Sequence, residues 1–150
     1  MSIREVIATL NQMEADGVID RYAIGGAVGA TFYLEPVATL DVDVFVASRG
    51  EPGMIAGWPV QFLPPTTPLV EEALAESREV DVDGVPARAF SAEHLAAIAL
   101  QTGRAKDKAR LLRFVEEGAL DAARFQEIVQ RHKLVDAWTR FERQFLSDAP

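Results

Sequence analysis

Cysteine is absent from this chain of 150 residues, so neither disulfide bonds nor thiolate metal sites can form. The sequence also lacks a run of about 18 apolar residues that could cross a bilayer, and its first ten residues contain no apolar core for export. No repeat or low-complexity tract occurs, and 49% of the residues are hydrophobic, which argues against disorder. We therefore expect a soluble cytoplasmic protein with one sizeable hydrophobic core.

Positive charge is also scarce, since the chain has a formal net charge of −8. This balance argues against a general affinity for nucleic acid. The charge is unevenly distributed: residues 1–100 hold 5 Lys and Arg against 15 Asp and Glu, whereas residues 101–150 hold 10 against 8. An acidic half that binds metal, followed by a more basic half, would suit a nucleoside triphosphate. A solvated helix face explains the same distribution equally well.

The hydrophobic pattern predicts an α/β (α+β) fold, in which helices flank a small mixed β-sheet and a helical C-terminal portion follows. We expect a single domain, with a sheet-containing core at 1–90 and a helical portion at 91–150 packed on it. Strands are predicted at 22–24, 41–47 and 58–63, a hairpin at 79–90, and a surface loop at 49–57. Helices are predicted at 2–16, 27–34, 68–76, 92–101, 105–117, 121–132 and 133–145.

Asp41 and Asp43 are the first candidate site residues, because they flank Val42 on a predicted strand. Residues i and i+2 of a strand point to the same face, so the two carboxylates would lie side by side. A divalent cation that prefers oxygen ligands, such as Mg²⁺ or Mn²⁺, would relieve their repulsion. The alternative is a pair of solvated acids on an edge strand. Asp81 and Asp83 have the same spacing, but they run into Gly84, so turn formation explains them.

Gly25 and Gly26 follow the strand at 22–24 and precede a predicted short helix. Glycine lets a ligand approach the backbone closely, and the N–H groups at a helix start favour a phosphate group. The two glycines are therefore candidate nucleotide-binding residues. Close packing of the helix on the sheet is the alternative explanation.

Two segments together resemble a known family. In YAIGGAVGATFYLEPVATLDVDVFV, from Tyr22 to Val46, an apolar residue, Gly-Gly, a short helix and Asp-x-Asp on a strand follow one another. This order is similar to that of the nucleotidyltransferase superfamily, which has the fold of polymerase beta. The second segment, LQTGRAKDKARL from Leu100 to Leu111, contains a Gly-Arg-x-Lys-Asp pattern. With it, the chain resembles the small bacterial proteins grouped with the AbiEii-type toxins.

This resemblance implies a metal-dependent nucleotidyltransferase, which moves a nucleoside monophosphate from a nucleoside triphosphate to an acceptor hydroxyl. The resemblance does not identify the acceptor, which is left open among an RNA such as a tRNA, a protein and a small molecule. Asp41 and Asp43 would be the catalytic and metal-binding residues, and Lys106 would contact a nucleotide phosphate as a point charge. Asp107 would orient that lysine or cap its helix. A solvated pair on a helix is the alternative explanation of these last two residues.

The chain departs from the family pattern at several positions. Active members usually bring a third carboxylate from the next strand, where Gln61 stands here, and an amide cannot act as a carboxylate base. Val37 replaces an arginine of the toxin-like group, and Ala99 or Gln101 replaces a lysine. These departures favour the alternative of a catalytically impaired protein that binds a nucleotide or a partner protein, as in a toxin–antitoxin pair. A glycosyltransferase Asp-x-Asp site is a third interpretation, which the short chain and the early Gly-Gly turn disfavour.

Overall fold

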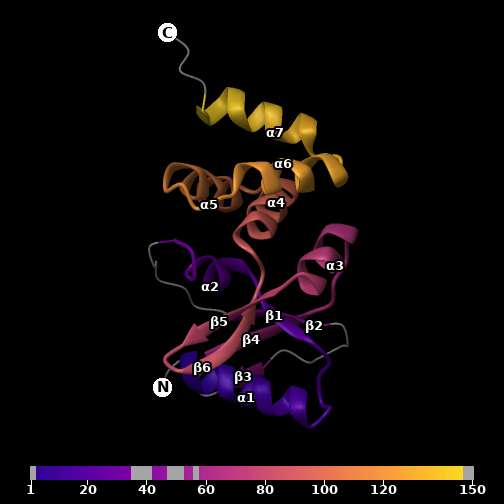
Figure 1. The fold of residues 1–150 in the computed structure, drawn as a ribbon, viewed down its shortest axis with the longest axis vertical. Helices are drawn as coiled ribbons and strands as arrows, with labels where there is room; N and C mark the ends of the chain where they lie inside the picture. Colours follow the sequence, from indigo (N-terminus) through magenta and orange to yellow (C-terminus); the bar gives the residue numbers. More distant parts are fainter. Residues whose placement is uncertain (1–2, 35–41, 47–52, 56–57, 147–150) are drawn as a thin grey trace. The chain divides into compact units, whose positions relative to one another are not determined.

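The structure is a computed structural model that describes residues 3–34, 42–46, 53–55 and 58–146. It divides into two compact units, Met1–Ser91 and Ala92–Pro150. The first unit, called the sheet unit below, contains all the strands of the described residues, and the second, the helical unit, contains helices (Figure 1). The predicted α/β class with a helical C-terminal portion is therefore confirmed. That the two portions form a single domain stays a prediction.

The described strands of the sheet unit form one mixed sheet with the order β3-β4-β2-β1-β6-β5. Strand β2 pairs in antiparallel fashion with β1 and in parallel fashion with β4, so it has a neighbour on both sides. This arrangement excludes the edge-strand position for the segment that carries Asp43. The strands are β1 (Tyr22–Ile24), β2 (Val42–Val46), β3 (Gly53–Ile55), β4 (Trp58–Leu63), β5 (Arg78–Val82) and β6 (Val85–Ala89).

The predicted surface loop at 49–57 is wrong in its second half, where strand β3 lies. Met54 pairs with Pro59 and Ile55 with Trp58 in an antiparallel ladder at the edge of the sheet. The glycines and the proline of this segment favour a loop locally. Backbone pairing with β4 outweighs the local preference of Gly53 for a loop.

Within the described residues, the helices of the sheet unit are α1 (Ile3–Ala15), α2 (Gly26–Ala30) and α3 (Pro68–Ala75). Helix α1 lies along one side of the strands and α3 along the other (Figure 1). Helix α2 ends earlier than the predicted residue 34, because the amides of residues 31–33 donate to carbonyls three residues back. Such bonds tighten the chain into a 3₁₀ turn.

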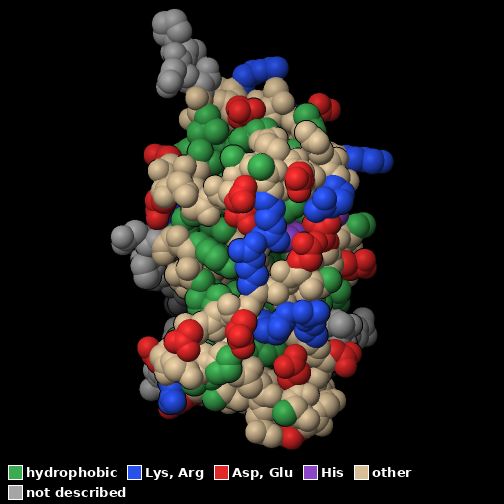
Figure 2. All heavy atoms as spheres, viewed as in Figure 1, with side chains coloured by type: hydrophobic (Ala, Val, Ile, Leu, Met, Phe, Trp, Pro, Cys, Tyr) green, Lys and Arg blue, Asp and Glu red, His purple; other side chains and the backbone are tan. Residues whose placement is uncertain are grey.

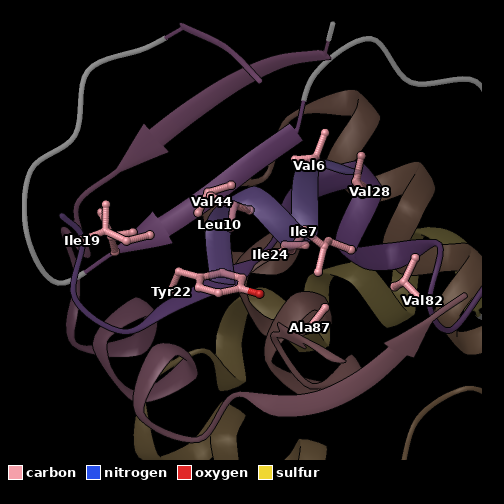
Figure 3. Packing of buried hydrophobic residues seen from close by; sticks show 11 residues of the cluster. Val6, Ile7, Leu10, Ile19, Tyr22, Ile24, Val28, Val44, Val82 and Ala87 are labelled. Carbon is pink, nitrogen blue, oxygen red and sulfur yellow. The ribbon is translucent and has the colours of Figure 1, made fainter. Parts of the chain in front are cut away.

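Side chains from α1, α2, four strands and the segment between α1 and β1 form the core of the sheet unit (Figure 3). The residues of this cluster are Val6, Ile7, Leu10, Ile19, Tyr22, Ile24, Val28, Val44, Val46, Val82 and Ala87. Tyr22 brings a polar atom into the cluster, and its hydroxyl donates to Oδ1 of Asn11 at 2.7 Å. Burial raises the pKa of Tyr22 to about 12, so this hydroxyl keeps its proton at neutral pH.

The helical unit contains α4 (Ala92–Thr102), α5 (Ala105–Glu116), α6 (Ala122–Arg131), α7 (Val135–Phe141) and the π-helical segment η1 (Glu142–Leu146). Its core includes Leu111, Phe114, Phe125, Ile128 and Val129, all of them buried. On the face shown in Figure 2, basic and acidic side chains are interspersed, as is typical of solvated helices. Across the described ranges, every helix is too short or too polar to traverse a bilayer.

Candidate functional site

The glycine turn, Gly25–Gly26, stands where β1 ends and α2 begins. Gly26 has a φ of +59°, in the left-handed region that favours glycine. Gly25 is extended, with φ −118° and ψ −155°, so its own backbone does not require glycine. The turn predicted from the sequence is therefore present, and the two glycines occupy it for different reasons.

Gly25 is required by close packing against two aromatic rings. A Cβ atom at this position would lie 2.7 Å from Cε2 of Phe45 and 3.2 Å from Cδ2 of Phe90. The centroids of these rings are 4.9 Å apart, so both contribute to one contact. Close packing alone therefore explains the glycine at position 25, which agrees with the alternative interpretation given for the two glycines. Contact of the turn with a phosphate stays a prediction.

Backbone pairing brings Asp43 next to the glycine turn and next to Gln61. Ile24, the last residue of β1, pairs with Val44, so the turn begins where β2 reaches Asp43. On the other side of β2, Asp43 pairs with Gln61 of β4 in the parallel register. The position expected for a third carboxylate therefore carries an amide. Asp41 lies outside the described residues.

Lys106 is the second residue of α5 and its side chain is exposed. It belongs to the helical unit, whereas the glycine turn and Asp43 belong to the sheet unit. Its contact with a nucleotide phosphate therefore remains a prediction.

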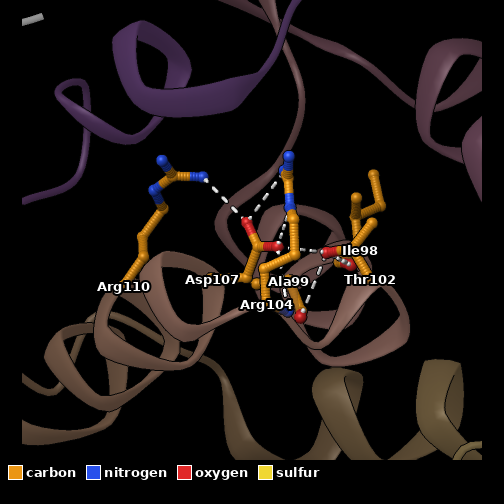
Figure 4. Close-up of polar contacts among 6 residues, drawn as sticks. All are labelled: Ile98, Ala99, Thr102, Arg104, Asp107 and Arg110. Carbon is orange, nitrogen blue, oxygen red and sulfur yellow. Dashed lines mark hydrogen bonds and ion pairs between the residues drawn. The ribbon is translucent and has the colours of Figure 1, made fainter.

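Asp107, the neighbour of Lys106, is buried and anchors the start of α5 (Figure 4). Its Oδ2 atom accepts hydrogen bonds from Nε of Arg104 at 2.7 Å and from the backbone N–H of Arg104 at 3.3 Å. The hydroxyl of Thr102, at the end of α4, donates to the same oxygen at 2.8 Å. Between the two helices Gly103 has a φ of +67°, which favours glycine. Of the two roles considered for Asp107, capping of the helix is the one observed.

These contacts decide the charge of Asp107. Burial raises the pKa of its carboxyl, but the hydrogen bonds from Arg104 and Thr102 and the charge of Arg104 outweigh burial and hold the pKa below its ordinary value. Arg110 adds a second guanidinium, with Nη1 3.9 Å from Oδ1. Asp107 is therefore an ionised structural residue.

The second Asp-x-Asp pair forms a turn, as expected. Asp83 has a φ of +51°, and the carboxylate of Asp81 accepts a hydrogen bond from the N–H of Gly84 at 3.2 Å. This hairpin joins β5 to β6 and accounts for both acids without a ligand.

An ion pair between a buried glutamate and a half-buried arginine in the helical unit was not predicted from the sequence. Glu93, on α4, accepts from Nη1 of Arg124 at 2.9 Å and from the backbone N–H of Asp121 at 3.0 Å. It thereby links α4 to the start of α6. Glu93 is 28 positions from Asp121 and 31 from Arg124. No local sequence pattern predicts a contact over such separations, so only the tertiary structure reveals it.

Comparison with known proteins supports the fold alone. No protein-family model and no curated protein matches the sequence. Among solved structures, an antigenic nucleotidyltransferase-like protein from Paracoccidioides brasiliensis is similar, with a TM-score of 0.58 and 15% sequence identity. The alignment covers 89% of this chain and 90% of that one. The chain therefore has a nucleotidyltransferase-like fold, and its narrower resemblance to AbiEii-type toxins stays a prediction.

We predict that Gly25→Ala destabilises the protein by about 1–3 kcal/mol, because the new methyl group displaces the ring of Phe45. Phe45→Leu in the same chain should recover part of that loss, since leucine leaves room for the methyl group. Urea denaturation of the two single variants and the double variant gives the coupling. Strictly additive losses would contradict this packing explanation.

We predict that Asp107→Asn lowers the free energy of unfolding at pH 7 by about 1–3 kcal/mol, because the charged acceptor for Arg104 is lost. A lowered pKa stabilises the fold only while the carboxyl is ionised. The difference from wild type should therefore be complete above about pH 4 and shrink as the pH falls through the lowered value.

Urea denaturation between pH 7 and pH 3 measures this difference. Glu127→Gln, which changes an exposed carboxylate on α6, is the matched control and should cost less than about 0.5 kcal/mol. A loss at Asp107 that does not vary with pH would show that its charge is not what stabilises the helix start.

Proposed function

We propose that this protein is a metal-dependent nucleotidyltransferase that transfers a nucleoside monophosphate from a nucleoside triphosphate to an acceptor hydroxyl. The observation that carries the proposal is the position of Asp43 on a central strand, beside the end of β1 where the glycine turn begins. The nucleotidyltransferase-like fold supports the same proposal, since a similar solved structure is described as a nucleotidyltransferase-like protein.

Asp41 and Asp43 are the proposed ligands of Mg²⁺ or Mn²⁺. The donor set fits such an ion, because carboxylate oxygens, with the amide oxygen of Gln61 as a candidate next to them, are the ligands that hard divalent cations prefer. A cation bound there would supply the positive charge that makes the α-phosphorus of the nucleotide susceptible to attack.

Residues of the chain itself would orient the nucleotide and neutralise the charge of the leaving group. The backbone N–H groups of the glycine turn orient the triphosphate, which keeps the α-phosphorus in line with the incoming hydroxyl. The exposed ammonium group of Lys106 neutralises charge on the departing pyrophosphate. The acceptor is an RNA, a protein or a small molecule.

A second candidate function is favoured by Gln61. This residue pairs with Asp43 at the position where a third carboxylate is expected, and an amide cannot accept the proton of the attacking hydroxyl. A chain that binds a nucleotide or a partner protein without turnover, as in a toxin–antitoxin pair, would retain the fold and the two aspartates.

We predict that calorimetric titration of ATP, GTP, CTP and UTP detects binding of at least one nucleotide that depends on Mg²⁺. Replacing both aspartates, Asp41→Asn with Asp43→Asn, should weaken that binding at least about tenfold, because two charged ligands are lost. The matched control is Asp81→Asn with Asp83→Asn, which removes the same charges at the same spacing from a hairpin turn. Equal weakening in both double variants would contradict the assigned metal site.

Gln61→Glu separates the two candidate functions. If the amide is what limits turnover, the new carboxylate should raise transfer from a nucleoside triphosphate to water or an added acceptor about a hundredfold, the usual scale of a general base. Radiolabelled nucleotide and chromatography measure the products, with Gln61→Met as the control for the substitution itself. If the wild type transfers the nucleotide and Gln61→Glu does so at the same rate, the amide of Gln61 does not limit turnover.

A further inference from the structure

The helical unit contains a cavity of about 310 Å³ to which neither the proposed transferase site nor the contacts described above assign a role. It lies among α4, α5, α7 and η1, so it is formed within one unit of the chain. Its volume is at the lower end of the range of small-molecule sites, which favours a ligand no larger than a mononucleotide. The residues around it are Leu100, Gln101, Gly103, Lys108, Leu134, Ala137, Arg140, Phe141 and Gln144.

The floor of this cavity is apolar and fixed. Leu100, Leu134 and Phe141 are all buried in the helical unit. The ring of Phe141 stacks on Trp138, with centroids 5.6 Å apart and planes 17° from parallel. A ligand would therefore meet a preformed surface, which keeps the entropy cost of binding low.

The rim of the cavity carries two cations, Lys108 and Arg140, and no carboxylate. Other arginines of the helical unit pair with acids: Arg104 and Arg110 with Asp107, Arg113 with Glu117, and Arg124 with Glu93. Neither Lys108 nor Arg140 forms an ion pair with a carboxylate in the described part of the chain. What sets Lys108 and Arg140 apart is that both line one cavity with an apolar floor.

We propose that this cavity binds a small phosphorylated molecule, whose phosphate lies between Lys108 and Arg140. A phosphate dianion matches two cations, and the planar guanidinium of Arg140 can donate two parallel hydrogen bonds to its oxygens. The amide of Gln144 offers a donor and an acceptor for the remainder of the ligand, and the flat or apolar part of the ligand covers the floor. This inference goes beyond the proposed transferase function and requires neither Asp41 nor Asp43.

The test is calorimetric titration of the full chain without divalent cations, with AMP, inorganic phosphate and adenosine as probes. AMP should bind, phosphate should bind more weakly and compete with it, and adenosine should bind at least about tenfold more weakly than AMP. Lys108→Gln and Arg140→Gln should each weaken AMP binding about tenfold. Arg143→Gln, which changes an exposed arginine of η1 outside the cavity lining, is the matched control and should bind as wild type does.

Two further variants keep the result decisive. Ala137→Leu fills the cavity while both cations remain, so it should block AMP binding even if a charge variant folds poorly. Asp41→Asn with Asp43→Asn should leave AMP binding intact. The double variant therefore tests the cavity in the helical unit separately from the proposed transferase site. Absence of AMP binding at millimolar concentration, equal binding of adenosine, or unchanged binding by the Lys108, Arg140 and Ala137 variants would each overturn the proposal.

Discussion

The burial of β2 between β1 and β4 is the constraint on which the rest of the sheet unit depends. Val44 and Val46 have no exposed surface, and each loses core contacts if the strand slips by one residue. Their register with β1 fixes the glycine turn beside the start of β2, and their register with β4 fixes Gln61 opposite Asp43. The burial of Val44, the neighbour of Asp43, therefore determines where Asp43 lies relative to the glycine turn and Gln61.

In the two segments that resemble the nucleotidyltransferases, residues with an observed structural role lie next to residues with a proposed functional role. Packing against Phe45 and Phe90 accounts for Gly25, and the turn between α4 and α5 accounts for Gly103. Helix capping accounts for Asp107. Lys106 is exposed, as a solvated helix residue would be, and its contact with a nucleotide phosphate stays a prediction.

Local sequence signals predicted much of this fold, because periodicity and turn chemistry act over a few residues. Apart from β3, the strands of the sheet and the helices of the second unit lie within a few residues of their predicted limits, and Asp83–Gly84 forms the expected turn. Strand β3 was missed because its pairing with β4 outweighs its own composition. The burial of Asp107, the Glu93–Arg124 pair and the cavity beside Lys108 and Arg140 depend on helices meeting in space, which no local pattern encodes.

The central claim is that the start of β2 binds a divalent cation together with a nucleotide. Mn²⁺ titration of the isotope-labelled protein with a bound nucleoside triphosphate tests it most directly, because a paramagnetic ion broadens the amide resonances nearest to it. The claim predicts that broadening is strongest at Gly25, Gly26 and Val44 and is lost in the Asp41→Asn, Asp43→Asn double variant. Broadening centred on the Asp81–Gly84 turn, or none in the sheet unit, would contradict it.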